Sequence, residues 1–276
     1  MLTDGEPVVR LAVFMAIFAV LAWWEHRSPA RALSLPRAMR WRANLGLALV
    51  DVLVMRLVIP GSALAVAALA AEEGWGLLPR LALPGWMAVA LAVVFLDLVV
   101  YLQHVLFHMV PALARLHAVH HADPDFDLTT GIRFHPFEIL LSALIKIAAV
   151  AALGAPVLAV LVFEVFLNAT AMFNHANASL PAWLEPWARR LVVTPDMHRI
   201  HHSVVESERN SNYGFCLSVW DRLLGTWTPA ARGNLEIGLA DWRDPQLIAT
   251  LPGVLRMPFL RTLSGFRCTQ AGKRPT

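Results

Sequence analysis

Five long apolar stretches dominate the chain, and segments rich in polar and charged residues separate them. The apolar stretches run from about Val8 to Trp24, Leu45 to Ala71, Trp86 to Val110, Ile139 to Leu153, and Val157 to Phe173. A helix needs about 20 apolar residues to cross the hydrocarbon core of a bilayer, so the first three stretches are long enough to span it. Gly154, Ala155 and Pro156 separate the last two, which predicts a helical hairpin that either spans or re-enters the membrane.

The C-terminal third of the chain contains many prolines and no apolar stretch of spanning length. It predicts a cap of short helices and loops, with an interfacial amphipathic segment from Leu255 to Phe266 that Pro258 interrupts. The predicted fold is therefore all-α. We expect a multi-span helical membrane protein with about four to five membrane segments and a cytosolic, histidine-rich helical cap.

Composition supports a membrane location. Hydrophobic residues make up 57% of the chain, charged residues 16%, and the mean hydropathy is +0.55, values that exclude an ordinary soluble domain. Cys216 and Cys268 form no Cys-x-x-Cys pair, so neither a disulfide framework nor a cysteine zinc site is predicted. The net charge of +3 suits loops that face anionic lipid, and no basic stripe with interleaved aromatic residues indicates nucleic acid as a partner.

The distribution of arginines predicts the orientation of the spans. Five arginines follow the first apolar stretch between residues 27 and 42, whereas Glu72, Glu73 and a single Arg80 follow the second. The positive-inside rule then places residues 25–43 in the cytoplasm. With five crossings, everything from about residue 174 onward is also cytoplasmic, and the histidine motifs described next lie at that face.

Histidine motifs are the main chemical signal in the sequence. The pattern His-x-x-His-His occurs twice and follows a His-x-x-x-His pair, at positions His117, His120, His121, His198, His201, His202, His104 and His108. Side chains three or four residues apart lie on one side of a helix, so the rings of each motif can converge on a metal. Eight imidazoles exceed the four to six ligands of one ion, which predicts two ions.

Imidazole ligands alone suit zinc, iron, copper or nickel. An apolar setting with no thiolate ligands favours non-haem iron and oxygen chemistry on an apolar chain. A metal transporter is one alternative, but it predicts ligands near the bilayer midplane on broken helices. A zinc-dependent lipid hydrolase is another, but the chain contains no His-Glu-x-x-His motif. Zinc readily occupies histidine sites during expression, so its presence in a preparation would not identify the native metal.

Further motifs accompany the histidines in a fixed order. They are Arg133–Glu138 (RFHPFE), Asn174–Asn177 (NHAN), Asn212–Gly214 (NYG) and Trp220–Trp227 (WDRLLGTW). With the histidine motifs they resemble the fatty acid hydroxylase / sterol desaturase superfamily over roughly residues 86–228. The resemblance implies N-terminal membrane spans in residues 1–85, a catalytic domain in residues 86–228, and a cytosolic or interfacial tail in residues 229–276.

The resemblance also implies an activity. It implies a membrane-bound non-haem di-iron oxygenase that uses O2 to hydroxylate or desaturate a C–H bond of a lipid such as a fatty acyl chain, sterol or isoprenoid. The catalytic metal ligands it implies are His104, His108, His117, His120, His121, His198, His201 and His202, with His175 as an additional ligand. His135 is either a further ligand or a residue held by Pro136 and bonded to Glu138. No segment resembles cytochrome b5, so a separate ferredoxin, cytochrome or reductase is expected to supply electrons.

Acidic and amide side chains near these motifs are candidates to orient the imidazoles. The candidates are Asp123, Asp125, Asp127, Glu138, Asn174, Asn177 and Asp196, although each also suits a helix cap or a turn. Asp97 lies inside an apolar stretch, two helical turns before His104. We expect it either to support the site or, preferably, to pair with Arg56.

Overall fold

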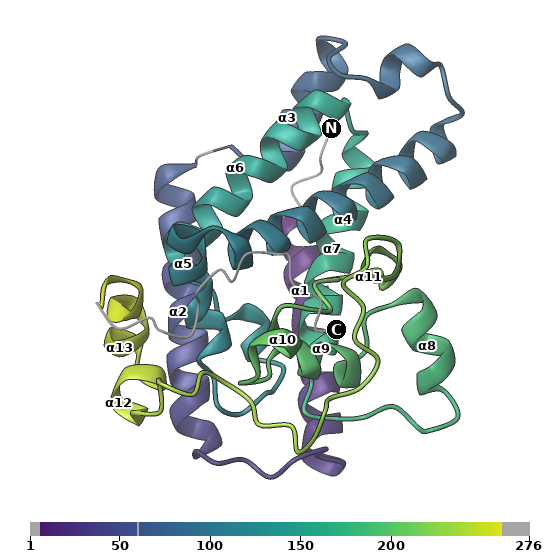
Figure 1. Ribbon diagram of the computed structural model, residues 1–276. Helices are drawn as coiled ribbons and strands as arrows, with labels where there is room; N and C mark the ends of the chain where they lie inside the picture. The colour runs from purple at the N-terminus through teal and green to yellow at the C-terminus, as the bar shows by residue number, and fades with distance from the viewer. Residues whose placement is uncertain (1–5, 60, 261–276) are drawn as a thin grey trace.

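The computed structural model describes residues 6–59 and 61–260, and over these residues the fold is entirely helical, with no β-strand (Figure 1). The long helices are α1 (Glu6–Arg27), α2 (Arg37–Val58), α3 (Ala63–Glu72), α4 (Gly85–Met109), α5 (Pro111–His121), α6 (Pro136–Leu153) and α7 (Val157–Asn174). The short helices are η1 (Leu78–Leu81), η2 (Thr130–Ile132), α8 (Glu185–Leu191), α9 (Pro195–His201), α10 (Glu206–Arg209), α11 (Val219–Leu223), α12 (Pro245–Ile248), α13 (Leu251–Arg256) and η3 (Met257–Phe259).

Five segments are long and apolar enough to cross a membrane. They are Val8–Arg27, Arg37–Glu72, Gly85–Met109, Pro136–Leu153 and Val157–Asn174. Their outer faces carry exposed apolar side chains, including Leu57 of α2, which is 82% exposed. Such faces match a lipid environment, where apolar side chains need no cover from other protein. The predicted all-α, multi-span architecture is confirmed.

The hairpin between α6 and α7 turns where the sequence predicts. Gly154 adopts a left-handed conformation (φ 64°) that ends α6, and Pro156 precedes the first residue of α7. The loop after α3 lies directly against this turn, because a Cβ added to Gly76 would fall 2.0 Å from the amide nitrogen of Gly154. No side chain other than hydrogen fits there, so the two segments are held at backbone contact.

A core of small and apolar side chains fills the space between α3, α4, α6 and α7. Its fully buried members include Ala67, Ala92, Ala159, Val160 and Phe163. Alanines let membrane helices approach closely, and close packing rather than the hydrophobic effect drives helix association in lipid. Helix α4 packs against α5, α6 and α7. Its C-terminal end, which contains His104 and His108, therefore lies beside the histidines of α5.

The C-terminal segment covers one side of α2 and α5. Trp242, Ile248 and Val254 are buried in a second core with Leu47 of α2 and Val119 of α5. Helix α13 contacts α2 directly, as Figure 1 shows for the yellow-green end of the chain. Of the expected interfacial segment Leu255–Phe266, residues 261–266 lie outside the described part of the chain.

A buried arginine on α2 fixes the loop that follows α5. The Arg40 side chain is fully buried; its Nε and Nη2 atoms donate to the two carboxylate oxygens of Asp123 at 2.7 Å each, and Nη1 donates to Asp127 at 2.6 Å. Burial alone would raise the pKa of Asp123, but the Arg40 charge outweighs it and lowers that pKa to about 2. The first histidine triplet, at the end of α5, is thereby anchored to α2.

Candidate metal centre

Nine histidine side chains converge in two adjacent groups. The first histidine group contains His104, His108, His117, His121 and His201, and the second histidine group contains His120, His175, His198 and His202. Within each group the candidate ligand nitrogens all lie within 4.8 Å of one another. Every one of the nine residues is at most 6% exposed. The groups touch, since the rings of His121 and His202 stack with their centroids 4.4 Å apart.

Each His-x-x-His-His triplet divides between the two groups. The residues four apart stay together, so His117 and His121 join the first group while His198 and His202 join the second. The middle residue of each triplet, three positions after the first, enters the opposite group. Positions i and i+4 are displaced by about +40° around a helix and i and i+3 by about −60°, so the motif presents two rings to one point and one ring to its neighbour. Each short helix therefore contributes rings to both of two adjoining sites.

Backbone carbonyls and one carboxylate orient the imidazoles. The Nδ1 atoms of His104, His175 and His201 contact the carbonyl oxygens of Tyr213 (2.8 Å), Ala171 (2.7 Å) and Ser211 (2.7 Å), and Nδ1 of His117 contacts Oε1 of Glu138 (2.7 Å). A carbonyl oxygen or an ionised carboxylate only accepts hydrogen bonds, so with Glu138 ionised all four Nδ1 atoms carry the proton. The Nε2 atoms of the same rings then hold lone pairs that point into the groups.

The Nε2 atoms lie so close together that their lone pairs would repel one another unless a proton or a cation lay between them. Nε2 of His104 is 3.1 Å from that of His117, and Nε2 of His175 is 3.1 to 3.2 Å from those of His120, His198 and His202. For His104 and His117 both Nδ1 atoms donate elsewhere, so no proton remains to join the two Nε2 atoms. A cation bound at about 2.1 Å by imidazole nitrogens places neighbouring ligands roughly 3 Å apart. The donor set therefore fits metal ions.

Burial keeps these imidazoles neutral. It lowers the pKa of His117 and of His175 to about 3, and it lowers the pKa of His201 in the same direction. Nε2 of His201 is buried and has no hydrogen-bond partner among the described residues. Neutral imidazole is the form that binds metal, so both groups can hold metal ions.

Motif residues between the histidines position the rings. Phe134 stacks on His120 with the ring centroids 4.5 Å apart and the planes at 10°, while the carbonyl oxygen of Arg133 lies 3.3 Å from Nδ1 of the same histidine. The Arg133 side chain is fully buried and donates to the carbonyls of Val119 and Ile248 at 2.7 Å. Arg133 and Phe134, which precede the α6–α7 hairpin, thus hold His120 in place.

A second loop is organised in the same way by Asp221. Its carboxylate accepts hydrogen bonds from the backbone amides of Tyr213 (2.7 Å) and Gly214 (2.8 Å) and from Oγ1 of Thr226 (2.7 Å). Burial raises the pKa of Asp221 to about 6. The carbonyl oxygen of Tyr213 accepts the hydrogen bond of His104. Asp221 therefore fixes the backbone segment that orients this candidate ligand.

The preferred prediction for Asp97, an ion pair with Arg56, is wrong. Its carboxylate does not pair with Arg56 but accepts hydrogen bonds from Nε1 of Trp220 (2.8 Å) and from the amides of Leu217 (3.1 Å) and Cys216 (3.3 Å). These donors are about 120 residues away in the chain, so no local pattern reveals them. The other expectation, that Asp97 supports the site, fits this contact with the loop that carries Tyr213.

His135 lies outside both histidine groups. Its side chain caps α6, where Nδ1 accepts from the amide of Phe137 at 3.3 Å and Nε2 lies 3.3 Å from the carbonyl oxygen of Leu255. The side chain of Glu138 bonds to His117 rather than to His135. The structure therefore does not bring His135 to the centre, and the alternative bond to the Glu138 side chain is not formed either.

Among the candidate orienting side chains, Glu138 alone is recorded in a hydrogen bond to an imidazole. Asp123 and Asp127 bind Arg40, and Asp196 binds Nη1 of Arg199 at 2.5 Å. Asp125 accepts from the amides of Ser34 and Leu35, Asn174 donates to the carbonyl of Phe215, and Asn177 bonds to the backbone of Arg31. Backbone carbonyls supply most of the support, and side-chain identities in a sequence do not display them.

Two cavities that share part of their lining lie near the histidine groups, and the inner one adjoins them. The inner cavity, of about 420 Å³, is lined partly by Gly131, Phe134, Ala171 and Phe215, each of which contacts or flanks a histidine of the centre. The outer cavity, of about 220 Å³, shares with it a lining that includes Val100, Gln103, Ser142 and Leu167.

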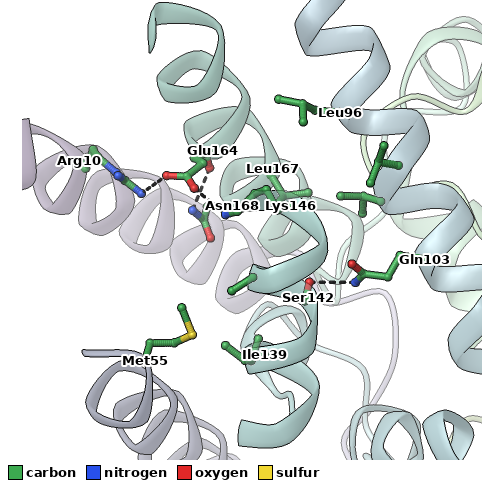
Figure 2. Close-up of a pocket in the computed structure, with 13 residues that line it drawn as sticks. Arg10, Met55, Leu96, Gln103, Ile139, Ser142, Lys146, Glu164, Leu167 and Asn168 are labelled. Carbon is green, nitrogen blue, oxygen red and sulfur yellow. Dashed lines mark hydrogen bonds and ion pairs between the residues drawn. The ribbon is translucent and has the colours of Figure 1, made fainter. Parts of the chain in front are cut away.

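The outer cavity extends between α1, α4, α6 and α7 (Figure 2). Figure 2 shows Arg10 and Lys146 on either side of Glu164 at one edge of this space, where they form ion pairs of 2.6 and 2.5 Å with its carboxylate. Most of the remaining lining is apolar. A long apolar molecule can therefore extend from the histidine groups into the helix bundle.

The fatty acid hydroxylase family model matches residues 89–226, which is half of the chain and contains all nine converging histidines. The chain belongs to the fatty acid hydroxylase family. The match begins in α4 and ends after α11, so this family region includes both histidine groups and the loops that orient them.

Two characterised relatives extend the comparison. The ornithine lipid hydroxylase OlsE of Rhizobium tropici is 32% identical over 155 residues, which cover 55% of this chain and 45% of the relative. The alkylglycerol monooxygenase of Xenopus tropicalis is 28% identical over 134 residues, which cover 47% of this chain and 28% of the relative. The chain thus matches less than half the length of either relative. No solved structure gives a significant match.

Proposed function

We propose that the protein is a membrane-bound non-haem di-iron oxygenase that hydroxylates, or desaturates, a C–H bond of a lipid with O2. The observation that carries this proposal is the convergence of five and four buried histidines in two touching groups beside a largely apolar cavity. Family membership and the printed activities of the two relatives, a lipid hydroxylase and a monooxygenase, support the same reaction class.

The first histidine group would hold one iron ion and the second histidine group the other. Bound iron supplies the capacity to activate O2 and oxidise an unactivated C–H bond. Imidazole ligands without thiolates also accept zinc, which is expected to replace iron in some preparations. His135 is not included in this ligand set, because it lies outside both groups.

The protein's own contribution is to hold the ligands and the lipid. Glu138 keeps His117 with its Nε2 lone pair toward the first group, and the carbonyl of Ala171 does the same for His175 in the second. Such supporting contacts fix the tautomer and raise ligand basicity. The apolar walls of the inner and outer cavities exclude water and place one part of a lipid beside the histidines.

We place the centre at the cytoplasmic face on the basis of the arginines between residues 27 and 42, which favour a cytoplasmic location for the loop between α1 and α2. The same face would receive electrons from a separate ferredoxin, cytochrome or reductase. The overall positive charge of the chain suits an acidic donor, although it also suits anionic lipid.

Lipid analysis of membranes that contain the active protein tests this proposal. Membranes with the wild type are compared with membranes that contain His201→Ala, which removes a candidate ligand, or His26→Ala, which removes an exposed histidine outside both groups. We expect an oxidised lipid with the wild type and with His26→Ala only. Labelled O2 should enter the product of a hydroxylation. An unchanged lipid profile from iron-loaded wild-type protein supplied with electrons, or full activity of His201→Ala, would overturn the proposal.

A further inference from the structure

A buried carboxylate without a partner lines the inner cavity. Asp51, on α2, is 7% exposed, and its Oδ1 atom has no hydrogen-bond partner among the described residues. Arg56 lies on the same helix and lines the same cavity, but it is exposed and no ion pair joins it to Asp51 in the described part of the chain. Asp51 therefore presents unused hydrogen-bonding capacity in an apolar, membrane-spanning region.

Other polar groups of this cavity already have partners. Nε2 of Gln103 donates to the hydroxyl of Ser142 at 2.8 Å, and Nδ2 of Asn168 donates to the carbonyl of Glu164 at 2.8 Å. These hydrogen bonds are directed at other groups of the protein and do not reach Asp51. The Oδ1 atom of Asp51 therefore receives no donor from Gln103 or Asn168 in the described part of the chain.

Glu138 places a second carboxyl group in the wall of the same cavity. Its Oε1 atom accepts the hydrogen bond of His117, while its Oε2 atom is buried and without a partner among the described residues. Helices α2 and α6 are in contact, so the two carboxyl groups line the inner cavity from adjacent helices. A cationic group between these helices would find an unused acceptor on each of them.

An unpaired carboxylate inside a membrane protein is costly, and such residues usually mark a binding site. We propose that the lipid substrate carries a protonated amine, and that Asp51 binds this ammonium group in the inner cavity. This inference rests on the proposed function and narrows its substrate to an amine-bearing lipid. The ammonium donates up to three hydrogen bonds, which suits an acceptor that the protein itself leaves unsatisfied.

The position of Asp51 also sets the direction of the lipid. The inner cavity borders the histidine groups through Phe134 and Phe215, whereas the outer cavity continues from it past Val100 and Leu167. An amine held by Asp51 therefore places the polar end of the lipid nearer the histidines and leaves its apolar chain to the outer cavity. Oxidation is then expected at or near the amine-bearing part rather than at the far end of the chain.

Equilibrium binding to the zinc-loaded full chain in detergent tests the inference without turnover. The two probes are N-palmitoyl ornithine and its side-chain N-acetylated form, in which a neutral amide replaces the charged ammonium group. A charged hydrogen bond in a buried site contributes enough to change affinity by about tenfold or more. We expect the wild type to prefer the free amine by at least about tenfold, and Asp51→Asn to lose this preference while it binds the acetylated probe as the wild type does.

Two further variants control for folding and for general charge effects. Asp51→Glu keeps the carboxylate and should keep the preference, and Glu72→Gln removes an exposed carboxylate at the end of α3 and should leave both affinities unchanged. Equal binding of the two probes by the wild type overturns the inference whatever the variants do. So does an unchanged preference in Asp51→Asn.

The outcomes separate this inference from the proposed function. A preference for the amine in a protein that oxidises no lipid would retain the binding site and reject the oxygenase. Oxidation of lipids by a wild type that binds both probes equally would retain the oxygenase and reject the role of Asp51.

Discussion

Replacing Arg40 with alanine should destabilise the protein more than the loss of a surface arginine can. The guanidinium is fully buried and makes three hydrogen bonds of 2.6 to 2.7 Å to the carboxylates of Asp123 and Asp127, both of which are also fully buried. Its removal leaves two carboxylates without their counter-charge. Breaking one buried ion pair costs about 3–5 kcal/mol, so we expect a loss of at least about 3 kcal/mol in the free energy of unfolding.

Thermal unfolding of the detergent-purified protein, followed by tryptophan fluorescence, measures this loss. A change of about 3 kcal/mol should lower Tm by roughly 6–12 °C in a chain of this size. Arg42→Ala is the matched control, because Arg42 lies on the same helix, is exposed, and donates only to the carbonyl of Ala38. Its Tm should change by about 2 °C or less. Equal Tm values for the two variants would refute the assignment of Arg40 as the anchor of the loop after α5.

Three other substitutions probe the centre itself. His120→Ala removes one of four nitrogens from the second histidine group, and we expect the metal content to fall from about two ions per chain to about one by elemental analysis. Gly131→Ala places a Cβ 2.4 Å from the carbonyl oxygen of Ala171, which orients a candidate ligand, so overpacking should cost about 1–3 kcal/mol and lower metal content at a fixed iron concentration. Glu138→Gln removes the charge that holds His117, and metal affinity should fall by about 10- to 100-fold in a competition with a chelator.

Each of these substitutions has a counterpart elsewhere in the chain. His26→Ala, Gly233→Ala and Glu73→Gln change the same residue types at positions outside both histidine groups, and a Cβ at Gly233 meets no atom within 4 Å. We expect wild-type metal content for all three. A centre variant with the same metal content and affinity as its counterpart would remove that residue from the proposed roles.

The sequence predicts the membrane helices well because apolar length is a local property. Each predicted span overlaps a helix, and Gly154 with Pro156 locates the α6–α7 turn. Glycine readily adopts the left-handed conformation that ends a helix, and proline fixes its own φ and cannot continue the preceding helix. The histidine motifs likewise indicate which rings can converge. They do not indicate that the middle ring of each triplet joins the outer two rings of the other triplet, because that depends on how α5 and α9 face each other in the folded protein.

Contacts between distant segments account for the wrong prediction about Asp97. Asp97 and Arg56 are both charged residues in apolar stretches, which makes them plausible partners in a sequence, but Trp220 and two backbone amides satisfy Asp97 instead. Nearly every residue has a backbone donor and acceptor, so the amino-acid sequence does not indicate which of them will bond to a given side chain. The supports of His104, His175 and His201 are carbonyl oxygens, so they too become visible only in the fold.

The spread of the histidines along the chain affects how the centre matures. The first histidine group includes His104 and His201, and the second includes His120 and His202, so each group draws on residues about 80 to 100 positions apart. All five candidate spans precede His201 and His202 in the chain, so every membrane helix is synthesised before the last ring of either group. Neither histidine group can then be complete until translation has passed residue 202, so we expect metal binding to be a late event that follows synthesis of the membrane helices.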